Sequence, residues 1–196
     1  MIGATATPSF ARPADGGVVF RPGPSKSVHG FGHWQDFVNN NFPWLEHRNH
    51  CTGSFEASVS AFAFGTGGLT MINARASEVI RTRRLAEASE SGYLKLLWQL
   101  SGECQVEQDD RRCHVQAGQT TVCDSTRPYR IRVADNAHFA VLMLPHSACP
   151  GWERISQKLC AQQLGDSGTL RVLAPLTTGT RPACICATST APSSLD

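Results

Sequence analysis

Apolar and polar residues alternate along the middle of the chain. From Ser54 onward the apolar positions recur every second residue, which is the period of a half-buried strand: Phe55, Ala57, Val59, Ala61 and Ala63. Short apolar stretches follow at near-regular intervals between turns rich in Gly, Ser and Asp, and they predict strands at residues 69–74, 77–85, 93–100, 104–108, 113–115, 119–123, 129–133 and 139–144. This rhythm is typical of an all-β sandwich or barrel, and a jelly-roll-like barrel fits it best.

Helical periodicity occurs on both sides of the predicted strands. Between Phe31 and Leu45 the apolar residues fall at spacings of three to five, which predicts a short amphipathic helix that stops near Pro43 and packs on the barrel or on its mouth. After Pro150 one stripe of a second helix, ending at Gly165, contains Trp152, Ile155 and Leu159. A third helix is expected to carry Leu170, Leu173 and Leu176.

The chain of 196 residues is long enough for one ordinary domain with a real core. We expect a flexible N-terminal arm at residues 1–27, rich in Pro, Gly, Ala and Ser, and a barrel at 28–148. Residues 149–176 are predicted to form an antiparallel helical hairpin. The Thr-, Ser-, Ala- and Pro-rich residues 177–196 are predicted to be a disordered tail.

Charge and hydropathy argue against a nucleic-acid-binding, membrane-spanning or secreted protein. The net charge of +2 is too small for the positive field of an autonomous nucleic-acid binder. No apolar run approaches the roughly 20 residues of a membrane-spanning helix, and the N-terminus lacks the basic start and apolar run of a signal peptide. The sequence therefore predicts a cytoplasmic protein that does not contact a membrane.

Eight cysteines are spread along the chain without a Cys-x-x-Cys pair. The only close pair, Cys184 and Cys186, does not have a usual zinc-binding spacing. Most of the cysteines are therefore interpreted as small buried apolar residues or free thiols rather than as metal ligands or disulfides.

The run Asp-Ser-Thr-Arg-Pro-Tyr at residues 124–129, after a Gln-Ala-Gly-Gln turn at 116–119, resembles a signature of the cupin-type sensor domain in AraC/XylS-family transcription regulators. Three further pieces occur in the family's order: Trp-Gln-Asp-Phe-Val at 34–38, Val-Ile-Arg-Thr-Arg-Arg at 79–84, and Tyr-Leu-Lys-Leu-Leu-Trp-Gln-Leu-Ser-Gly at 93–102. The resemblance covers roughly residues 28–176.

This resemblance implies a mainly β, cupin-like jelly-roll barrel whose interior at residues 54–144 holds a small organic effector and no metal. It also implies that the N-terminal arm covers the effector and that the C-terminal helix pair forms a homodimer through Trp152, Ile155, Leu159, Leu170 and Leu173. A complete regulator continues into two helix-turn-helix units, which the twenty residues after Leu176 cannot form. DNA is therefore expected to be reached only through a domain absent from this chain.

Catalytic signatures are missing from the sequence. A metal-dependent cupin needs three or four converging ligands, commonly a His-x-His pair with a Glu and a later His. The corresponding strand reads Leu-Leu-Trp-Gln-Leu at 96–100, Thr120 and Thr121 follow the next glycine turn, and the histidines at 47–50 are most simply a solvated face. No Gly-x-Ser-x-Gly elbow occurs. We therefore predict no enzymatic activity, metal or cofactor.

Polar residues on the predicted strands are suited to holding an aromatic or anionic effector: Arg81, Arg83, Trp98, Gln99, Asp124, Arg127 and Tyr129. A guanidinium can bind a carboxylate through two hydrogen bonds, and aromatic rings offer faces for stacking. Arg81 and Arg83 are expected on one strand face, which points either to the effector or to solvent. Asp124 and Arg127 can instead pair with each other, Trp98 can fill the core, and Tyr129 can bond to the backbone.

Two other classes of function are compatible with the sequence. A metal-dependent cupin oxygenase or isomerase would contain iron, zinc or manganese in stoichiometric amount. A protein-interaction module would hold a partner chain and gain no stability from any small compound.

Overall fold

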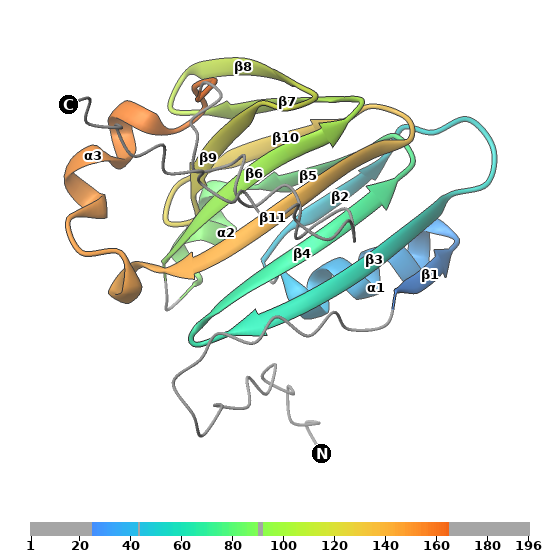
Figure 1. Ribbon diagram of the computed structural model, residues 1–196, viewed down its shortest axis with the longest axis horizontal. Helices are drawn as coiled ribbons and strands as arrows, with labels where there is room; N and C mark the ends of the chain where they lie inside the picture. The colour runs from blue at the N-terminus through green and yellow to red at the C-terminus, as the bar shows by residue number, and fades with distance from the viewer. Residues whose placement is uncertain (1–24, 43, 90–91, 165–196) are drawn as a thin grey trace, which may run out of the picture. The chain divides into compact units, whose positions relative to one another are not determined.

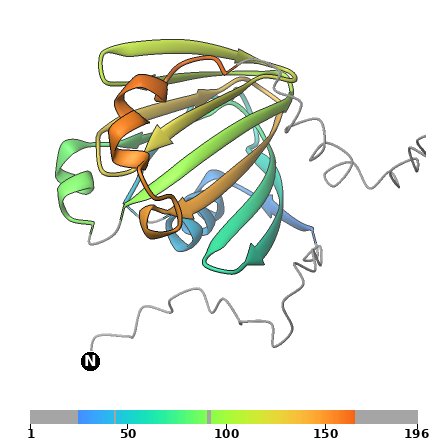
Figure 2. The same cartoon turned by 60° about the vertical axis from the view of Figure 1, so that its left-hand side comes forward.

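The computed structural model describes residues 25–42, 44–89 and 92–164. Within them two antiparallel sheets face each other across a shared core (Figures 1 and 2). The larger sheet has the strand order β1 (Lys26–His29), β3 (Glu56–Phe64), β4 (Gly67–Ala74), β11 (Ala137–Pro145), β6 (Tyr93–Ser101) and β9 (Thr120–Asp124). The smaller sheet has the order β2 (Glu46–Asn49), β5 (Ser77–Arg81), β10 (Tyr129–Val133), β7 (Glu103–Gln108) and β8 (Arg111–Gln116).

Each predicted strand overlaps a strand of the structure, and the fold is the mainly β, cupin-like arrangement expected from them. Alternation decides which side chains enter the core: Tyr129, Ile131 and Val133 of β10 are buried, whereas Arg130 and Arg132 between them point to the outer face. Those two arginines surround the buried carboxylate of Glu78 on the neighbouring strand at 3.8 and 3.5 Å.

The predicted strand at 77–85 is too long. β5 ends at Arg81, and α2 (Arg83–Glu87) begins after Thr82, whose hydroxyl accepts a hydrogen bond from the backbone N–H of Leu85 at 3.4 Å. Threonine is a favoured N-cap, and the Arg-Arg-Leu-Ala-Glu run after it consists of good helix formers. Arg83 is therefore exposed on a helix and does not share a strand face with Arg81.

Two short edge strands lie outside the predicted set. β1 pairs with β3 and β2 pairs with β5, so the histidine-rich stretch at 47–50 is in part a strand rather than only a solvated surface. Each strand has four residues, too few for a clear alternation. The predicted arm at 1–27 falls mostly outside the described residues, and its last two positions, Lys26 and Ser27, belong to β1.

The predicted N-terminal helix is confirmed as α1 (Phe31–Asn41), which lies against one end of the space between the sheets (Figure 1). Trp34 and Val38 are its buried residues. The helix ends because Phe42 precedes a proline and adopts an extended φ of −134°, as a residue before proline usually does.

The helix predicted after Pro150 is α3 (Trp152–Leu159), which follows a short 3-10 turn at His146–Ala148 and lies alongside β9 (Figure 2). It ends earlier than Gly165, because Cys160 becomes extended and forms a bridge to Val122, the first of two bridges that this segment makes with β9. The predicted third helix and the predicted tail lie outside the described residues.

Six cysteines lie in the described part of the chain, and all six are free thiols: Cys51, Cys104, Cys113, Cys123, Cys149 and Cys160. Cys104, Cys123 and Cys160 are buried, the first two in the main hydrophobic cluster and Cys160 beside Val122 and Trp152. Burial raises the pKa of the Cys104 thiol to about 12, so this side chain behaves as a small apolar residue.

Candidate functional site

A cavity of about 50 Å³ lies between the two sheets and under α1. Both sheets and the α1 region contribute to its lining: Trp34, Val38, Phe42, Leu45, Ile72, Ser77, Val79, Lys95, Leu97, Ile131, Val133, Phe139 and Val141. A cavity of this size has room for a few water molecules and is too small for an organic effector. Two side chains of α1, Trp34 and Val38, form part of the lining, and the expected effector-binding interior stays a prediction.

Lys95 is the one charged side chain in that lining. It is 4% exposed, and its Nζ donates a hydrogen bond to the hydroxyl oxygen of Tyr129 at 2.6 Å. The same Nζ lies 5.1 Å from the ring centroid of Phe42 and 4.9 Å from that of Tyr129. These ring faces attract the ammonium group, but no carboxylate of the described residues pairs with it.

Burial lowers the pKa of Lys95 from its ordinary value of 10.5 to about 8, because the ammonium loses its water without gaining a counter-ion. The positive charge of Arg81 lowers this pKa further. Burial also raises the pKa of the Tyr129 hydroxyl, so Tyr129 stays neutral beside the lysine. The cavity thus contains one ammonium group held by a phenol and two aromatic faces.

Arg81 lies at the same end of β5 and β10 as Tyr129, its register partner. Its Nε donates to the carbonyl oxygen of Ser125 at 2.5 Å, and its Nη1 donates to that of Trp44 at 3.2 Å. Trp44 has a φ of 70°, which is uncommon for a bulky residue, and it links α1 to β2. Arg81 therefore ties the segment after the helix to the turn after β9.

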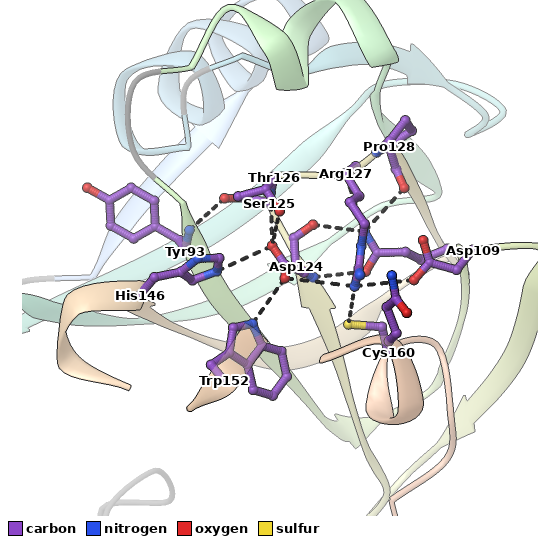
Figure 3. A network of polar contacts seen from close by, with 12 residues as sticks. Tyr93, Asp109, Asp124, Ser125, Thr126, Arg127, Pro128, His146, Trp152 and Cys160 are labelled. Carbon is purple, nitrogen blue, oxygen red and sulfur yellow. Dashed lines mark hydrogen bonds and ion pairs between the residues drawn. The ribbon is translucent and has the colours of Figure 1, made fainter. Parts of the chain in front are cut away.

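The Asp-Ser-Thr-Arg-Pro-Tyr motif forms a polar network on the other side of that turn (Figure 3). Asp124 Oδ1 accepts hydrogen bonds from the backbone N–H and the hydroxyl of Thr126 at 3.0 and 2.7 Å, and His146 Nε2 lies 3.3 Å away. Asp124 Oδ2 accepts from the indole N–H of Trp152 at 3.1 Å. The buried carboxylate therefore joins the turn to the first residue of α3.

Arg127 extends the same network. Its Nη2 lies 3.2 Å from Asp109 Oδ2 and 3.8 Å from Asp124 Oδ2, and it donates to the sulfur of Cys160 at 3.4 Å (Figure 3). The side-chain amide of Gln108 forms two hydrogen bonds with the backbone of Asp124. It donates to the carbonyl oxygen and accepts from the N–H, both at 2.8 Å. Asp124 and Arg127 thus contact protein groups and do not line the cavity.

The remaining predicted ligand residues lie elsewhere. Trp98 is on the face of β6 opposite Lys95 and Leu97 and is buried there, with no hydrogen-bond partner for its indole N–H. Gln99 is fully buried and donates to the carbonyl oxygen of Ser101 at 2.8 Å. Of the seven predicted residues, Tyr129 contacts Lys95, and Arg81 lies on the same inward-facing side of β5 as the cavity residues Ser77 and Val79.

The predictions from sequence did not include Lys95. The available signal is that it alternates in phase with Leu97, so a lysine shares a strand face with a core leucine. Periodicity alone does not reveal that α1 covers this face or that the lysine has no acidic partner.

The predicted dimerisation residues differ in how far they are buried. Trp152 is buried against β9, Leu159 is partly buried beside it, and Ile155 is 47% exposed on α3. Leu170 and Leu173 lie outside the described residues.

Metal-ligand clusters and membrane-spanning helices are absent from residues 25–42, 44–89 and 92–164. These residues contain no group of three or more His, Cys, Asp or Glu side chains that could hold a metal ion. No helix in this part of the chain is long and apolar enough to span a bilayer.

A family model and a curated protein match this chain. A family model described as an AraC-binding-like domain matches residues 34–182. The "Uncharacterized protein in nit 5′ region" of Bacillus sp. (strain OxB-1) is 26% identical over 131 residues, which are 67% of this chain and 51% of that protein. The chain thus spans about half the length of this curated relative.

Two solved structures match this chain to different extents. The AraC-like transcriptional activator CuxR has a TM-score of 0.67 and 18% identity, over 80% of this chain and 59% of that one. The EutQ protein of Clostridium difficile has a TM-score of 0.36 and 14% identity, over 46% of this chain and 64% of that one.

Proposed function

The chain belongs to the AraC-binding-like domain family, and we propose from this that it is the ligand-sensing and dimerisation part of a transcription regulator, without enzymatic activity. The effector is a small organic molecule that binds between the two sheets. One observation carries this proposal: a buried lysine faces a cavity under a helix whose other lining residues, apart from Ser77, are apolar or aromatic. Ligand sites are usually apolar clefts with a few placed polar groups.

Effector binding requires α1 to move, because the present cavity is too small for an organic molecule. Trp34 and Phe42 are the bulky side chains of this region that face the cavity, and Phe42 also covers Lys95. An effector that takes their place favours a second position of α1. The size of the response depends on the difference in effector affinity between the two positions.

A chain of contacts joins this helix to α3. Arg81 binds the carbonyl oxygens of Trp44, next to α1, and of Ser125, and the neighbouring Asp124 binds Trp152 at the start of α3. We propose that movement of α1 is passed along these contacts to the predicted dimerisation helix. Each step of this route is a direct contact between protein groups, so removing one contact should uncouple α1 from α3.

A thermal-shift screen tests effector binding. Small aromatic acids, amines and amides are added to the wild type, to Arg81→Ala and to the control Arg84→Ala, which removes an exposed arginine of α2. We expect at least one compound to stabilise the wild type, by about 2.7 kcal/mol when its concentration is 100 times the dissociation constant. Arg81→Ala should reduce this gain and Arg84→Ala should not. A screen in which no compound raises the melting temperature contradicts the proposal.

A light-scattering experiment tests dimerisation through α3. Replacing the exposed Ile155 with Glu should convert a dimer into a monomer, because a charge on a closely packed apolar interface costs several kcal/mol. Leu159→Glu should do the same, and the exposed Gln157→Glu on the same helix is the control. Circular dichroism checks that each variant is folded. An unchanged mass for folded Ile155→Glu removes this helix from the interface.

A further inference from the structure

We infer that the effector is a small monocarboxylate with an apolar body, whose carboxylate pairs with Lys95 between the two sheets. This inference rests on the proposed function and adds the chemical class of the ligand. It starts from a group whose charge is unbalanced in the described structure: the Lys95 ammonium has a hydroxyl and two ring faces around it, but no acidic partner.

An isolated buried charge is unfavourable, and proteins usually pair such a charge or neutralise it. Lys95 lies in the interior at 4% exposure, with Tyr129 as its hydrogen-bonding partner. An ammonium group has three donors, so hydrogen bonds remain to be made toward the cavity. A carboxylate oxygen beside it would satisfy these donors and supply the missing negative charge.

The rest of the lining decides what is attached to that carboxylate. Apart from Lys95 and Ser77, the residues that line the cavity are apolar or aromatic. A polyhydroxylated ligand such as a sugar would leave most of its hydroxyl groups without partners against these walls. A second carboxylate would meet no second cation in the lining. The cavity therefore favours one anionic group on a hydrocarbon or aromatic body.

The position of Phe42 links this chemistry to the movement of α1. The ring of Phe42 lies over the Lys95 ammonium, and Phe42 follows directly on the last residue of α1. A carboxylate that approaches Nζ competes with this ring for the same cation. An ion pair with the acid replaces the contact between Lys95 and the Phe42 ring, which releases the end of α1. A neutral compound cannot form this ion pair.

Calorimetric titration of matched compounds tests the inference. The probes are hexanoate, octanoate, benzoate and phenylacetate, each compared with its primary amide at pH 7. We expect at least one acid to bind the wild type about 100-fold more tightly than its amide. The amide lacks the negative charge, and the loss of one partner of a buried charge pair has an effect of about this size. Lys95→Met and Lys95→Gln should remove this preference. Arg84→Met, which removes an exposed cation, should keep it.

The pH dependence of binding gives a second readout. The charged or titratable groups around Lys95 are Tyr129 of β10, Cys123 of β9 and Arg81 of β5. Because only the protonated lysine attracts an anion and its pKa is about 8, the affinity for the acid should fall about tenfold per pH unit above pH 8. The affinity for the matched amide should stay constant over the same range.

The outcomes separate the inference from the proposed function. Equal affinities for acids and amides, or acid binding that survives in Lys95→Met, overturn the carboxylate assignment. Failure of all four acids overturns it as well. In each of these cases, stabilisation of the wild type by an amine or an amide in the thermal-shift screen leaves the sensing function in place.

Discussion

Replacing Lys95 with methionine is expected to raise the free energy of unfolding of the unliganded protein by about 2–3 kcal/mol at pH 7. The pKa of this lysine falls from 10.5 to about 8 on folding, and the difference corresponds to about 3 kcal/mol of cost for the buried charge. Methionine is similar in length, carries no charge and adapts to irregular apolar surroundings. Urea unfolding of the two proteins under reducing conditions measures the change.

The pH dependence of this difference has a definite sign. Between pH 8 and 10.5 the unfolded lysine holds its proton while the folded lysine releases it, so the stability of the wild type rises toward that of the variant. Below pH 8 the difference should be constant. Buried thiols such as Cys104, whose pKa is raised to about 12, destabilise the folded state with rising pH, but they do so in both proteins and cancel in the comparison.

Arg84→Met on α2 is the matched control, because it removes a cation that is already exposed; its stability should change by less than about 0.5 kcal/mol. Equal stability of the wild type and Lys95→Met at pH 7 would show that the ammonium is compensated in the unliganded protein. A measured stability cost at Lys95 would be consistent with the trade-off between stability and function that binding sites commonly show.

The longer strands could be predicted from the sequence because short apolar stretches between turns, many with alternating burial, are visible locally, whereas β1 and β2 have only four residues each and were missed. α1 was also predictable from its apolar spacing and from Pro43. The step from β5 to α2 was not, because a single side chain, Thr82, ends the strand and caps the helix. Local capping outweighs strand propensity at that position.

The site was harder to predict because it depends on which residues meet across the fold. Tyr129 and Arg81 were identified from the motif, but the partner that gives Tyr129 its role, Lys95, comes from another sheet. Asp124 and Arg127 were selected as polar residues of a family signature. Their partners in α3 and after it, Trp152 and Cys160, are 28 and 33 residues away in the chain, and no local pattern predicts that contact.

Replacing Asp124 with alanine is expected to lower the free energy of unfolding by about 3–5 kcal/mol, the usual cost of removing one partner from a buried charged network. The change leaves the indole N–H of Trp152 and the N–H of Thr126 without their acceptor and removes one of the two carboxylates near Arg127. Urea unfolding measures the loss. Amide hydrogen exchange should show that α3 becomes less protected than β10, whose backbone bonds do not depend on Asp124.

Two further variants test whether Asp124 stabilises the protein through the whole hydrogen-bond network or only through its ion pair with Arg127. Asp109→Ala removes the other acidic partner of Arg127, a partly exposed side chain 3.2 Å away, and should cost less than about 1 kcal/mol. Asp124→Asn keeps an acceptor for Trp152 or for Thr126 and should fall between these values. If Asp124→Ala is no more harmful than Asp109→Ala, the network does not hold α3 on β9. The contacts from Arg81 through Ser125 and Asp124 to Trp152 could then not transmit the movement of α1.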